Sequence, residues 1–169
     1  DIDPYRTREE LFLQKTGRGS PVVVNEAMRL GQKFEGAARA LLYFEHGHEF
    51  EPHVCVHPDL PYIKASLDGI TEDGLICEIK YMGAKNFDKI LSSQDPLEHH
   101  YPQVQHQMLA KGVNKVLYVP YILNPSRQSI DKLQIVEVIR NDAFINAQLL
   151  PRLKEFWAEV VEWTEKNQP

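Results

Sequence analysis

The stretch that decides the fold is residues 65–80, which read ASLDGITEDGLICEIK. Two runs of alternating apolar and polar residues flank a short polar turn, and this pattern predicts a β-hairpin. We expect residues 72–74 to form a three-residue loop with Gly74 in the left-handed conformation, a common way to close an antiparallel pair. Thr71 then faces Leu75, and this pairing fixes the register of both strands.

The predicted register places charged side chains opposite one another. Asp68 falls opposite Glu78 and Ser66 opposite Lys80, and all four share one face of the sheet because side chains alternate along a strand. Opposed carboxylates, with Cβ atoms about 5 Å apart, repel each other and weaken a hairpin. The pair therefore needs a counter-charge, which Lys80 supplies in part and a divalent cation would complete. The other face is apolar and belongs to the core; it holds Ala65, Leu67, Leu75, Cys77 and Ile79.

A cation beside Asp68 and Glu78 points to phosphodiester chemistry. Hard cations such as Mg²⁺ prefer carboxylate and carbonyl oxygens and keep several waters for a substrate phosphate. Such an ion stabilises charge on the phosphate and lowers the pKa of a bound water, which becomes the nucleophile. Lys80 can hold that water or help to deprotonate it. An exposed hairpin with a surface salt bridge explains the same alternation equally well, so both interpretations stand at this point.

The rest of the chain predicts helices around a mixed sheet. Thr7 and Glu10 have the spacing of a capping box at the start of a helix, and Pro151 should kink or restart the last helix. The order of elements indicates an α/β or α+β fold around one sheet. We expect helices at residues 6–16, 25–45, 98–111 and 142–166, and strands at residues 51–57, 62–70, 75–80, 116–119 and 133–139.

Composition and charge narrow the class of protein. The chain has 169 residues, of which 43% are hydrophobic and 25% charged, as expected for one globular domain with a real core. Its net charge of −5 argues weakly against nucleic acid as a partner, although an acidic nuclease can still present a local basic groove. Cys55 and Cys77 are too few for a disulfide framework, which indicates a reducing cytoplasm. No apolar run is long enough to span a bilayer. Residues 1–5 resemble the interior of a secondary-structure element and not its beginning, so we expect a further segment upstream.

Several motifs occur together and in order, which makes them more specific than any one alone. Asp68 and the later run Glu78-Ile79-Lys80 resemble the PD-(D/E)xK nuclease signature. Together with their surroundings they resemble the YqaJ-like viral recombinase family, to which the phage lambda exonuclease belongs. Leu67 stands where the signature usually has proline, which should be harmless because Leu67 points into the core. The matching stretches are residues 5–17, 33–40 (KFEGAARA), 66–69 (SLDG), 77–80 (CEIK) and 101–107 (YPQVQHQ).

This resemblance implies a fold, an activity and partners. The fold is a restriction-endonuclease-like α/β core, a central mixed sheet flanked by helices, in a single domain over residues 1–169. The activity is that of a Mg²⁺-dependent exonuclease, for which Mn²⁺ substitutes, that degrades duplex DNA from the 5′ end and leaves 3′ single-stranded overhangs. The partners are double-stranded DNA ends, a single-strand annealing protein and further copies of the chain in a trimeric ring. The setting is the cytoplasm of a bacterial host that carries a phage or prophage, with no membrane partner.

The resemblance also assigns roles to individual residues. Asp68 and Glu78 are implied metal ligands, the main-chain carbonyl of Ile79 is a third, and Lys80 positions the attacking water. The family's segment that contacts the DNA end precedes the first helix, and this chain starts after or within it. The resemblance also places Glu35 behind the metal site, where it contacts the ion directly or through water. Ser66 and Gln103 are implied to orient the substrate phosphate or Lys80. Gln105 and Lys85 are implied to contact the substrate.

Other interpretations stay open. An endonuclease of the same fold, or a catalytically silent DNA-binding module, would share these motifs. Lys85 and Lys89 form either one wall of a DNA groove or an ordinary solvated face. Trp157 and Trp163 are expected in the core or at a subunit contact. The histidines have a spacing that fits no structural zinc site, and no paired cysteines accompany them, so we expect surface residues at His46, His48, His53 and His57.

Overall fold

The chain forms two compact units, and a single domain over residues 1–169 stays a prediction. A computed structural model describes residues 6–21, 23–124, 126–127 and 129–167. The larger unit comprises residues 24–140, and the smaller combines the chain up to residue 23 with the chain from residue 141 onward. The expectation of an upstream segment rests on residues 1–5, which lie outside the described residues. In the described part of the chain, no helix is both long enough and apolar enough to cross a membrane.

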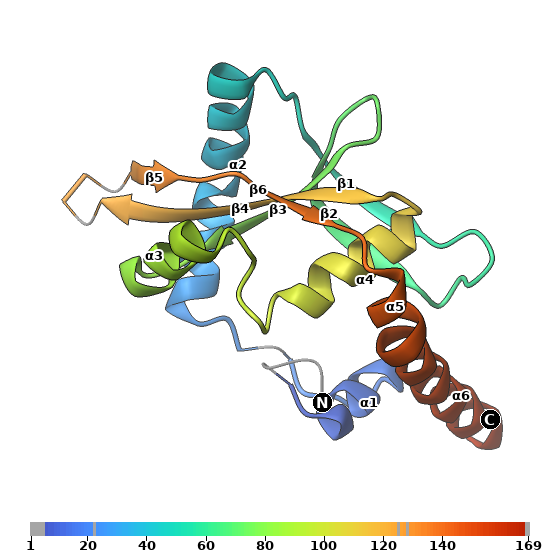
Figure 1. The fold of residues 1–169 in the computed structure, drawn as a ribbon. Helices are drawn as coiled ribbons and strands as arrows, with labels where there is room; N and C mark the ends of the chain where they lie inside the picture. Colours follow the sequence, from blue (N-terminus) through green and yellow to red (C-terminus); the bar gives the residue numbers. More distant parts are fainter. Residues whose placement is uncertain (1–5, 22, 125, 128, 168–169) are drawn as a thin grey trace. The chain divides into compact units, whose positions relative to one another are not determined.

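A mixed six-stranded sheet forms the centre of the larger unit (Figure 1). Strands β3 and β4 are parallel, and all other neighbouring strands pair antiparallel. The order is β1-β2-β3-β4-β5, and β6 also pairs with β4. This mixed sheet confirms the predicted fold class. The strands are β1 (Glu51–Val56), β2 (Lys64–Ile70), β3 (Ile76–Tyr81), β4 (Lys115–Asn124), β5 (Ser129–Leu133) and β6 (Val136–Ile139).

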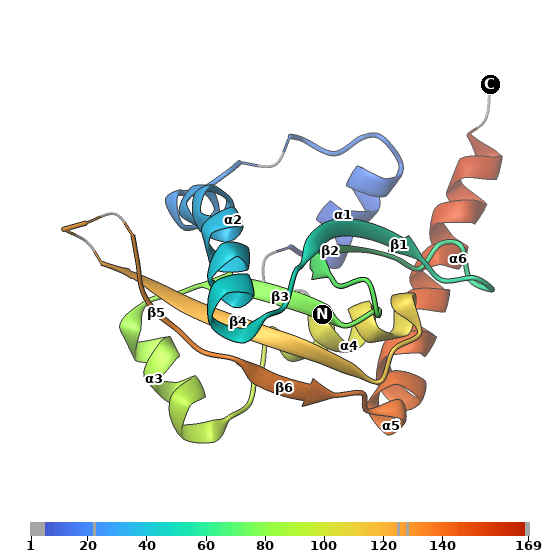
Figure 2. The same ribbon diagram turned by 90° about the horizontal axis from the view of Figure 1, so that it is seen from above.

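The last predicted strand is interrupted in the structure. Tyr121 pairs with Leu133 and Tyr118 with Val136, so the end of β5 and β6 share one register along the same edge of β4 (Figure 2); within β5 the register shifts between Ile122 and Leu123. The break lies opposite Pro120, which has no backbone N–H to donate to a partner strand. The single strand expected at residues 133–139 is therefore wrong: β5 starts earlier, and the proline splits the pairing.

Three helices cover the sheet: α2 (Glu26–His46), α3 (Ala84–Ser93) and α4 (Tyr101–Lys111). In the view of Figure 1, α3 and α4 lie below the strands and the second half of α2 rises above them. Helix α2 begins and ends as predicted, with Asn25 accepting from the Met28 N–H and Gly47 in the left-handed conformation at φ 71°. Helix α4 ends at Lys111 as predicted, with Gly112 as its C-cap, but begins three residues later than expected. Helix α3 was not predicted, because its N-cap, Gly83, makes no side-chain hydrogen bond.

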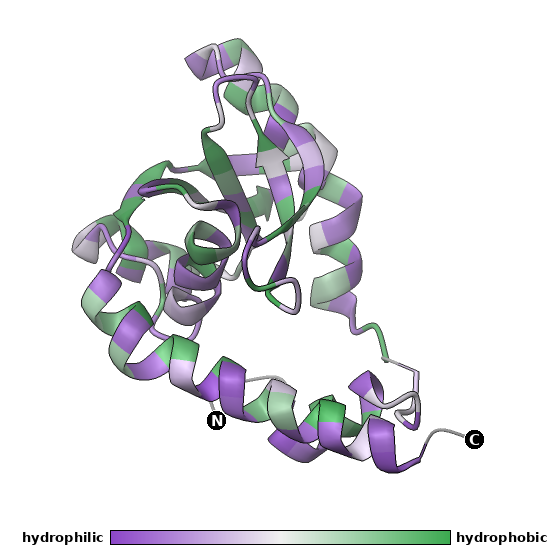
Figure 3. Cartoon of the chain, turned by 90° about the vertical axis from the view of Figure 1, so that its right-hand side faces the viewer, coloured by the Kyte–Doolittle hydropathy of each residue, from purple (hydrophilic) through white to green (hydrophobic). Residues whose placement is uncertain are grey.

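The core separates into two layers on either side of the sheet. One layer is built around α2, whose Phe34, Ala38 and Leu42 pack with Cys77 and Ile79 of β3. Helix α4 packs on the strands as well, chiefly on β2, and buries Val104, Met108 and Leu109. Figure 3 shows hydrophobic residues concentrated in the strands, with hydrophilic and hydrophobic residues alternating along the helices. The apolar face predicted for the hairpin is confirmed, since Leu67, Cys77 and Ile79 are buried.

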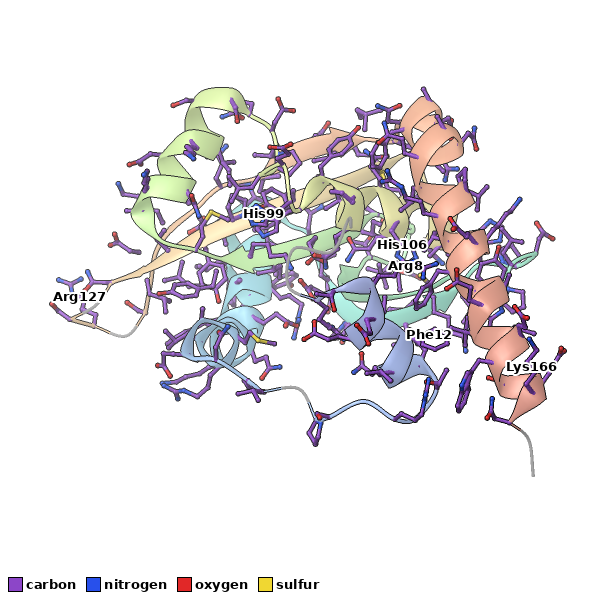
Figure 4. The ribbon with its side chains drawn as sticks, turned by 90° about the horizontal axis from the view of Figure 1, so that it is seen from below. Arg8, Phe12, His99, His106, Arg127 and Lys166 are labelled. Carbon is purple, nitrogen blue, oxygen red and sulfur yellow. The ribbon has the colours of Figure 1, made fainter. Side chains whose placement is uncertain are left out.

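The smaller unit pairs α1 (Arg8–Lys15) with α6 (Leu150–Lys166). The capping box of Thr7 and Glu10 is formed as predicted. Phe12, labelled in Figure 4, packs edge-on against Phe156 and Trp163, which confirms a packing role for that tryptophan. The predicted restart at Pro151 is also confirmed: α5 (Asp142–Phe144) leads into a π-helical segment (Ile145–Leu149), and α6 then begins with the proline in its first turn.

Candidate active site

The hairpin between β2 and β3 closes as its sequence predicts. The Thr71 N–H donates to the Leu75 carbonyl at 2.9 Å, and Gly74 has φ 89°. The ladder then pairs Ile70 with Ile76 and Gly69 with Cys77, which is the register set by a three-residue loop. At Gly69 the strand passes close to its surroundings: a Cβ there would lie 2.6 Å from Phe50 Cβ and 2.8 Å from Cys77 Sγ. Only glycine fits at this point without displacing the core.

Beyond Gly69 the two strands separate at what we call the fork, where Asp68 lies between β2 and β3. The Ile79 N–H donates to Asp68 Oδ2 at 2.8 Å, although a regular ladder would direct it at the Leu67 carbonyl. The Asp68 side chain thus replaces a backbone partner and ends the ladder. The predicted direct opposition of Ser66 and Lys80 is wrong for this reason: the described β2–β3 pairing stops at Gly69 and Cys77.

Glu78 is the buried centre of the fork, with 1% of its surface exposed. Its Oε1 lies 2.5 Å from Lys80 Nζ and accepts from Gln103 Nε2 at 2.6 Å. Its Oε2 accepts from Gln107 Nε2, which also donates to the Ser66 carbonyl at 3.3 Å. A carboxylate is stable at this depth only when charged and polar partners replace its lost water, and here one ammonium and two amides do so.

Helix α2 supplies a third carboxylate next to the fork. Glu35 forms an ion pair with Arg39 one turn further along the helix. The same guanidinium donates to the main-chain carbonyl of Asp68 at 2.9 Å. Arg39 therefore connects Glu35 to the hairpin strand that carries Asp68.

Negative charge accumulates around Asp68. Burial, followed by the charges of Glu78 and Glu35, raises the pKa of its carboxyl to about 7, although the Ile79 N–H and Lys80 oppose the rise. A carboxylate whose charged form is this unfavourable marks a place where an added positive charge would be stabilised. The repulsion inferred from the predicted opposition of Asp68 and Glu78 is therefore present, although the two residues are not paired in a regular ladder.

The donor chemistry of the fork fits a hard divalent cation. Asp68 and Glu78 offer carboxylate oxygens, which Mg²⁺ prefers, and the charge on Asp68 lacks a full counter-charge. Gln107 Oε1 adds a buried acceptor with no hydrogen-bond partner among the described residues. Within that part of the chain, no three His, Cys, Asp or Glu side chains already stand together as a metal cluster. The acidic groups are instead held by Lys80, Arg39 and the two amides, which a cation would have to displace in part. The histidines form no metal cluster in the described residues either.

Comparison with known proteins identifies the family of this site. The family model for the YqaJ-like viral recombinase domain matches residues 1–114. The chain belongs to this family. The comparison with curated proteins found no match.

Solved structures share the fold of this YqaJ-like chain. An alkaline exonuclease, LHK-Exo from Laribacter hongkongensis, is 26% identical with a TM-score of 0.76, covering 94% of this chain and 80% of the other. The same enzyme in complex with dAMP has 25% identity and a TM-score of 0.77, again covering 94% of this chain and 80% of the other. A phage-related exonuclease from Haemophilus somnus 129PT is 10% identical with a TM-score of 0.64, covering 93% of this chain and 82% of the other. That last likeness concerns the fold alone.

The remaining predicted site residues of the YqaJ-like chain fall into two groups. Ser66 and Gln103 lie at the fork, where Ser66 is exposed on β2 and Gln103 is exposed on α4. Lys85 lies on α3 and lines an open depression with Lys89 and residues of the loop before α4. Gln105 needs a correction as a substrate contact: it is fully buried, and its amide donates to the Ile139 carbonyl at 2.9 Å. This glutamine anchors α4 to the sheet.

Three contacts near the fork were missed by sequence reasoning. Gln103 and Gln107 are four residues apart and share one face of α4, and this spacing is a signal that could have placed both on Glu78. Arg39 gave no signal beyond its distance from Glu35 along the helix. His100 is buried, and its Nδ1 lies 2.6 Å from the Tyr118 hydroxyl. Burial, together with the charge of Lys80, lowers the pKa of His100 to about 3, so this imidazole is neutral.

Proposed function

We propose that this chain is a metal-dependent exonuclease that hydrolyses duplex DNA. The observation that carries the proposal is the fork itself: buried Glu78, held by Lys80, beside Asp68, whose charge is only partly offset. Membership of the YqaJ-like family and the likeness to LHK-Exo at 26% identity support the exonuclease class. We further propose that degradation runs 5′ to 3′ and leaves 3′ single-stranded overhangs for recombination.

Asp68, Glu78 and the Ile79 carbonyl would hold Mg²⁺ or Mn²⁺, with Glu35 nearby directly or through water. A bound ion of this kind stabilises charge on the scissile phosphate and lowers the pKa of a bound water. Lys80 lies 2.5 Å from Glu78 Oε1 and is one-quarter exposed, so its ammonium can reach a water at the mouth of the fork and orient it. Ser66 and Gln103, both exposed at the same place, would orient the substrate phosphate.

DNA binding by an acidic chain requires a local positive surface. Lys85 and Lys89 are exposed on α3 and line the depression beside it, which Asp88, Asp95 and Glu98 also line, so the positive charge is limited to the two lysine side chains. We propose that they contact the DNA backbone, since lysine side chains that neutralise phosphates supply much of the affinity for DNA. A single-strand annealing protein, a ring of three copies and a cytoplasmic location in a phage-carrying bacterium are part of the same proposal.

The test uses linear duplex labelled at either the 5′ or the 3′ end, alongside closed circular duplex, with Mg²⁺ or with EDTA. We expect loss of label from the linear substrate only, with Mg²⁺ only, and release of the 5′ label first. Cleavage of the closed circle would establish an endonuclease instead.

Variants assign the activity to the fork. Lys80→Ala and Asp68→Asn should lower the rate of cleavage about 10²-fold or more, whereas Asp73→Asn, on the exposed hairpin loop, should leave it unchanged. Equal activity in all of these proteins would remove the site assignment. Inactivity of the wild type under every metal condition, with DNA binding retained, would show a silent binding module.

A further inference from the structure

We propose that Gln107 is a positioning residue that holds one oxygen of Glu78 and leaves the other for the cation. The two oxygens of this carboxylate have different partners: Oε1 meets Lys80 and Gln103, whereas Oε2 meets Gln107. This inference rests on the proposed metal site and assigns the individual ligand atom within it.

The two sets of partners differ in their freedom to move. Gln103 is exposed and the Lys80 side chain is 25% exposed, so both can turn toward solvent when a cation approaches Oε1. Gln107 is 2% exposed and has no solvent to turn into. A cation can therefore take Oε1 at little cost, while Oε2 stays with the amide.

The orientation of the Gln107 amide is determined by its surroundings. Nε2 faces two acceptors, Glu78 Oε2 and the Ser66 carbonyl oxygen. Turning the amide over would place Oε1 against both of these oxygens, which would lose two hydrogen bonds and add repulsion. The amide thereby bridges β2 and β3 beyond the point where their ladder ends, because Ser66 belongs to one strand and Glu78 to the other.

Helix α4 holds Gln107 in place from both sides. Gln105 donates to the Ile139 carbonyl at 2.9 Å, and Met108 beside it is fully buried. At the start of the helix, His100 contacts the Tyr118 hydroxyl at 2.6 Å, and Tyr118 pairs with Glu78 in the sheet. The helix is thus attached to β6 and to β4, the strand next to β3 of the fork, and it also packs on β2, so Gln107 presents its amide from a rigid support.

Hydrogen-bonded partners behind a metal ligand orient it, and their loss commonly weakens metal binding about 10- to 100-fold. We therefore compare Mn²⁺ binding by titration calorimetry for the wild type, Gln107→Met and Gln103→Met, with thermal unfolding as a check of folding. We expect Gln107→Met to raise the Kd for Mn²⁺ about 10-fold or more, and the matched Gln103→Met to change it less than about 3-fold.

A wild type that does not bind Mn²⁺ would remove the proposed metal site and this inference together. A folded Gln107→Met protein that binds Mn²⁺ as tightly as the wild type would remove the inference alone. A second measurement does not depend on the variant folding: side-chain amide NMR signals of the wild type during a Mg²⁺ titration. We expect the Gln107 NH₂ protons to keep slow solvent exchange while those of Gln103 lose it, and the reverse order would overturn the proposal.

Discussion

Replacing Asp68 by asparagine should stabilise the metal-free protein, because the charge on this carboxylate is unfavourable in the folded state. Its pKa rises from the usual 3.8 to about 7, first through burial and then through Glu78. The folded state therefore binds the Asp68 proton more tightly than the unfolded state does, and stability falls as pH rises from about 4 through about 7. Above about pH 7 the unfavourable charge on Asp68 lowers the stability by its full amount.

The expected size follows from the same shift. At about 1.4 kcal/mol per pKa unit, the penalty at pH 8 has an upper limit of roughly 4 kcal/mol. Asparagine removes the charge and can still accept from the Ile79 N–H, but that bond becomes a neutral one and loses about 1 kcal/mol. Asp68 is also partly exposed, so solvent screens some of the repulsion. A net gain of about 1–3 kcal/mol is expected from these opposing effects.

Urea unfolding in EDTA at pH 8 and at pH 4.5 measures this gain. Asp68→Asn should be more stable than wild type at pH 8, and the difference should shrink toward zero at pH 4.5. Asp73→Asn is the matched control on the same hairpin: the Thr71 hydroxyl lowers the pKa of Asp73, so this substitution should not stabilise the protein. With Mg²⁺ or Mn²⁺ the wild type should gain thermal stability and the Asp68→Asn protein should gain less. A metal-free Asp68→Asn protein no more stable than wild type at pH 8 would refute the charge repulsion at the fork.

Three further outcomes are expected. Lys80→Ala should lower the single-turnover rate constant for cleavage of linear duplex about 10²- to 10⁴-fold, the usual range for a group that positions or deprotonates a nucleophile. A smaller loss would argue against that role. The pKa of His100 is about 3 in the folded protein, below its unfolded value, so the free energy of unfolding should fall as pH drops below about 6.5. Between pH 7 and pH 5 the wild type should lose about 2 kcal/mol more than His100→Gln. Parallel curves of unfolding free energy against pH for the two proteins would contradict the buried neutral imidazole. Gly69→Ala should destabilise the protein by about 1–3 kcal/mol through overpacking. Gly36→Ala in α2, where an added Cβ would lie 3.9 Å from the Arg39 side chain, should stabilise it by about 0.5–1 kcal/mol. Equal changes in the free energy of unfolding, measured by chemical denaturation, would show that the core can yield at Gly69.

Much of the fold could be predicted because its signals are local. The capping box at Thr7 and the left-handed glycine at Gly74 each depend on a few neighbouring residues, and the structure has both as predicted. Helix α3 could not be predicted in the same way: it starts at Gly83 without a side-chain cap and ends at Gln94 in the left-handed conformation. Its position depends on packing Phe87 and Ile90 into the core.

The candidate site shows the same division between local and tertiary information. By itself the sequence determined the hairpin loop at residues 72–74 and hence which residues reach the fork, because a turn type sets the register of the strands it joins. Only the tertiary structure decided that Asp68 ends the ladder, that Glu78 is buried, and that Gln107 and Arg39 meet this hairpin. These contacts join segments far apart in the chain, and their geometry follows from how α2 and α4 pack on the sheet, which no local pattern encodes.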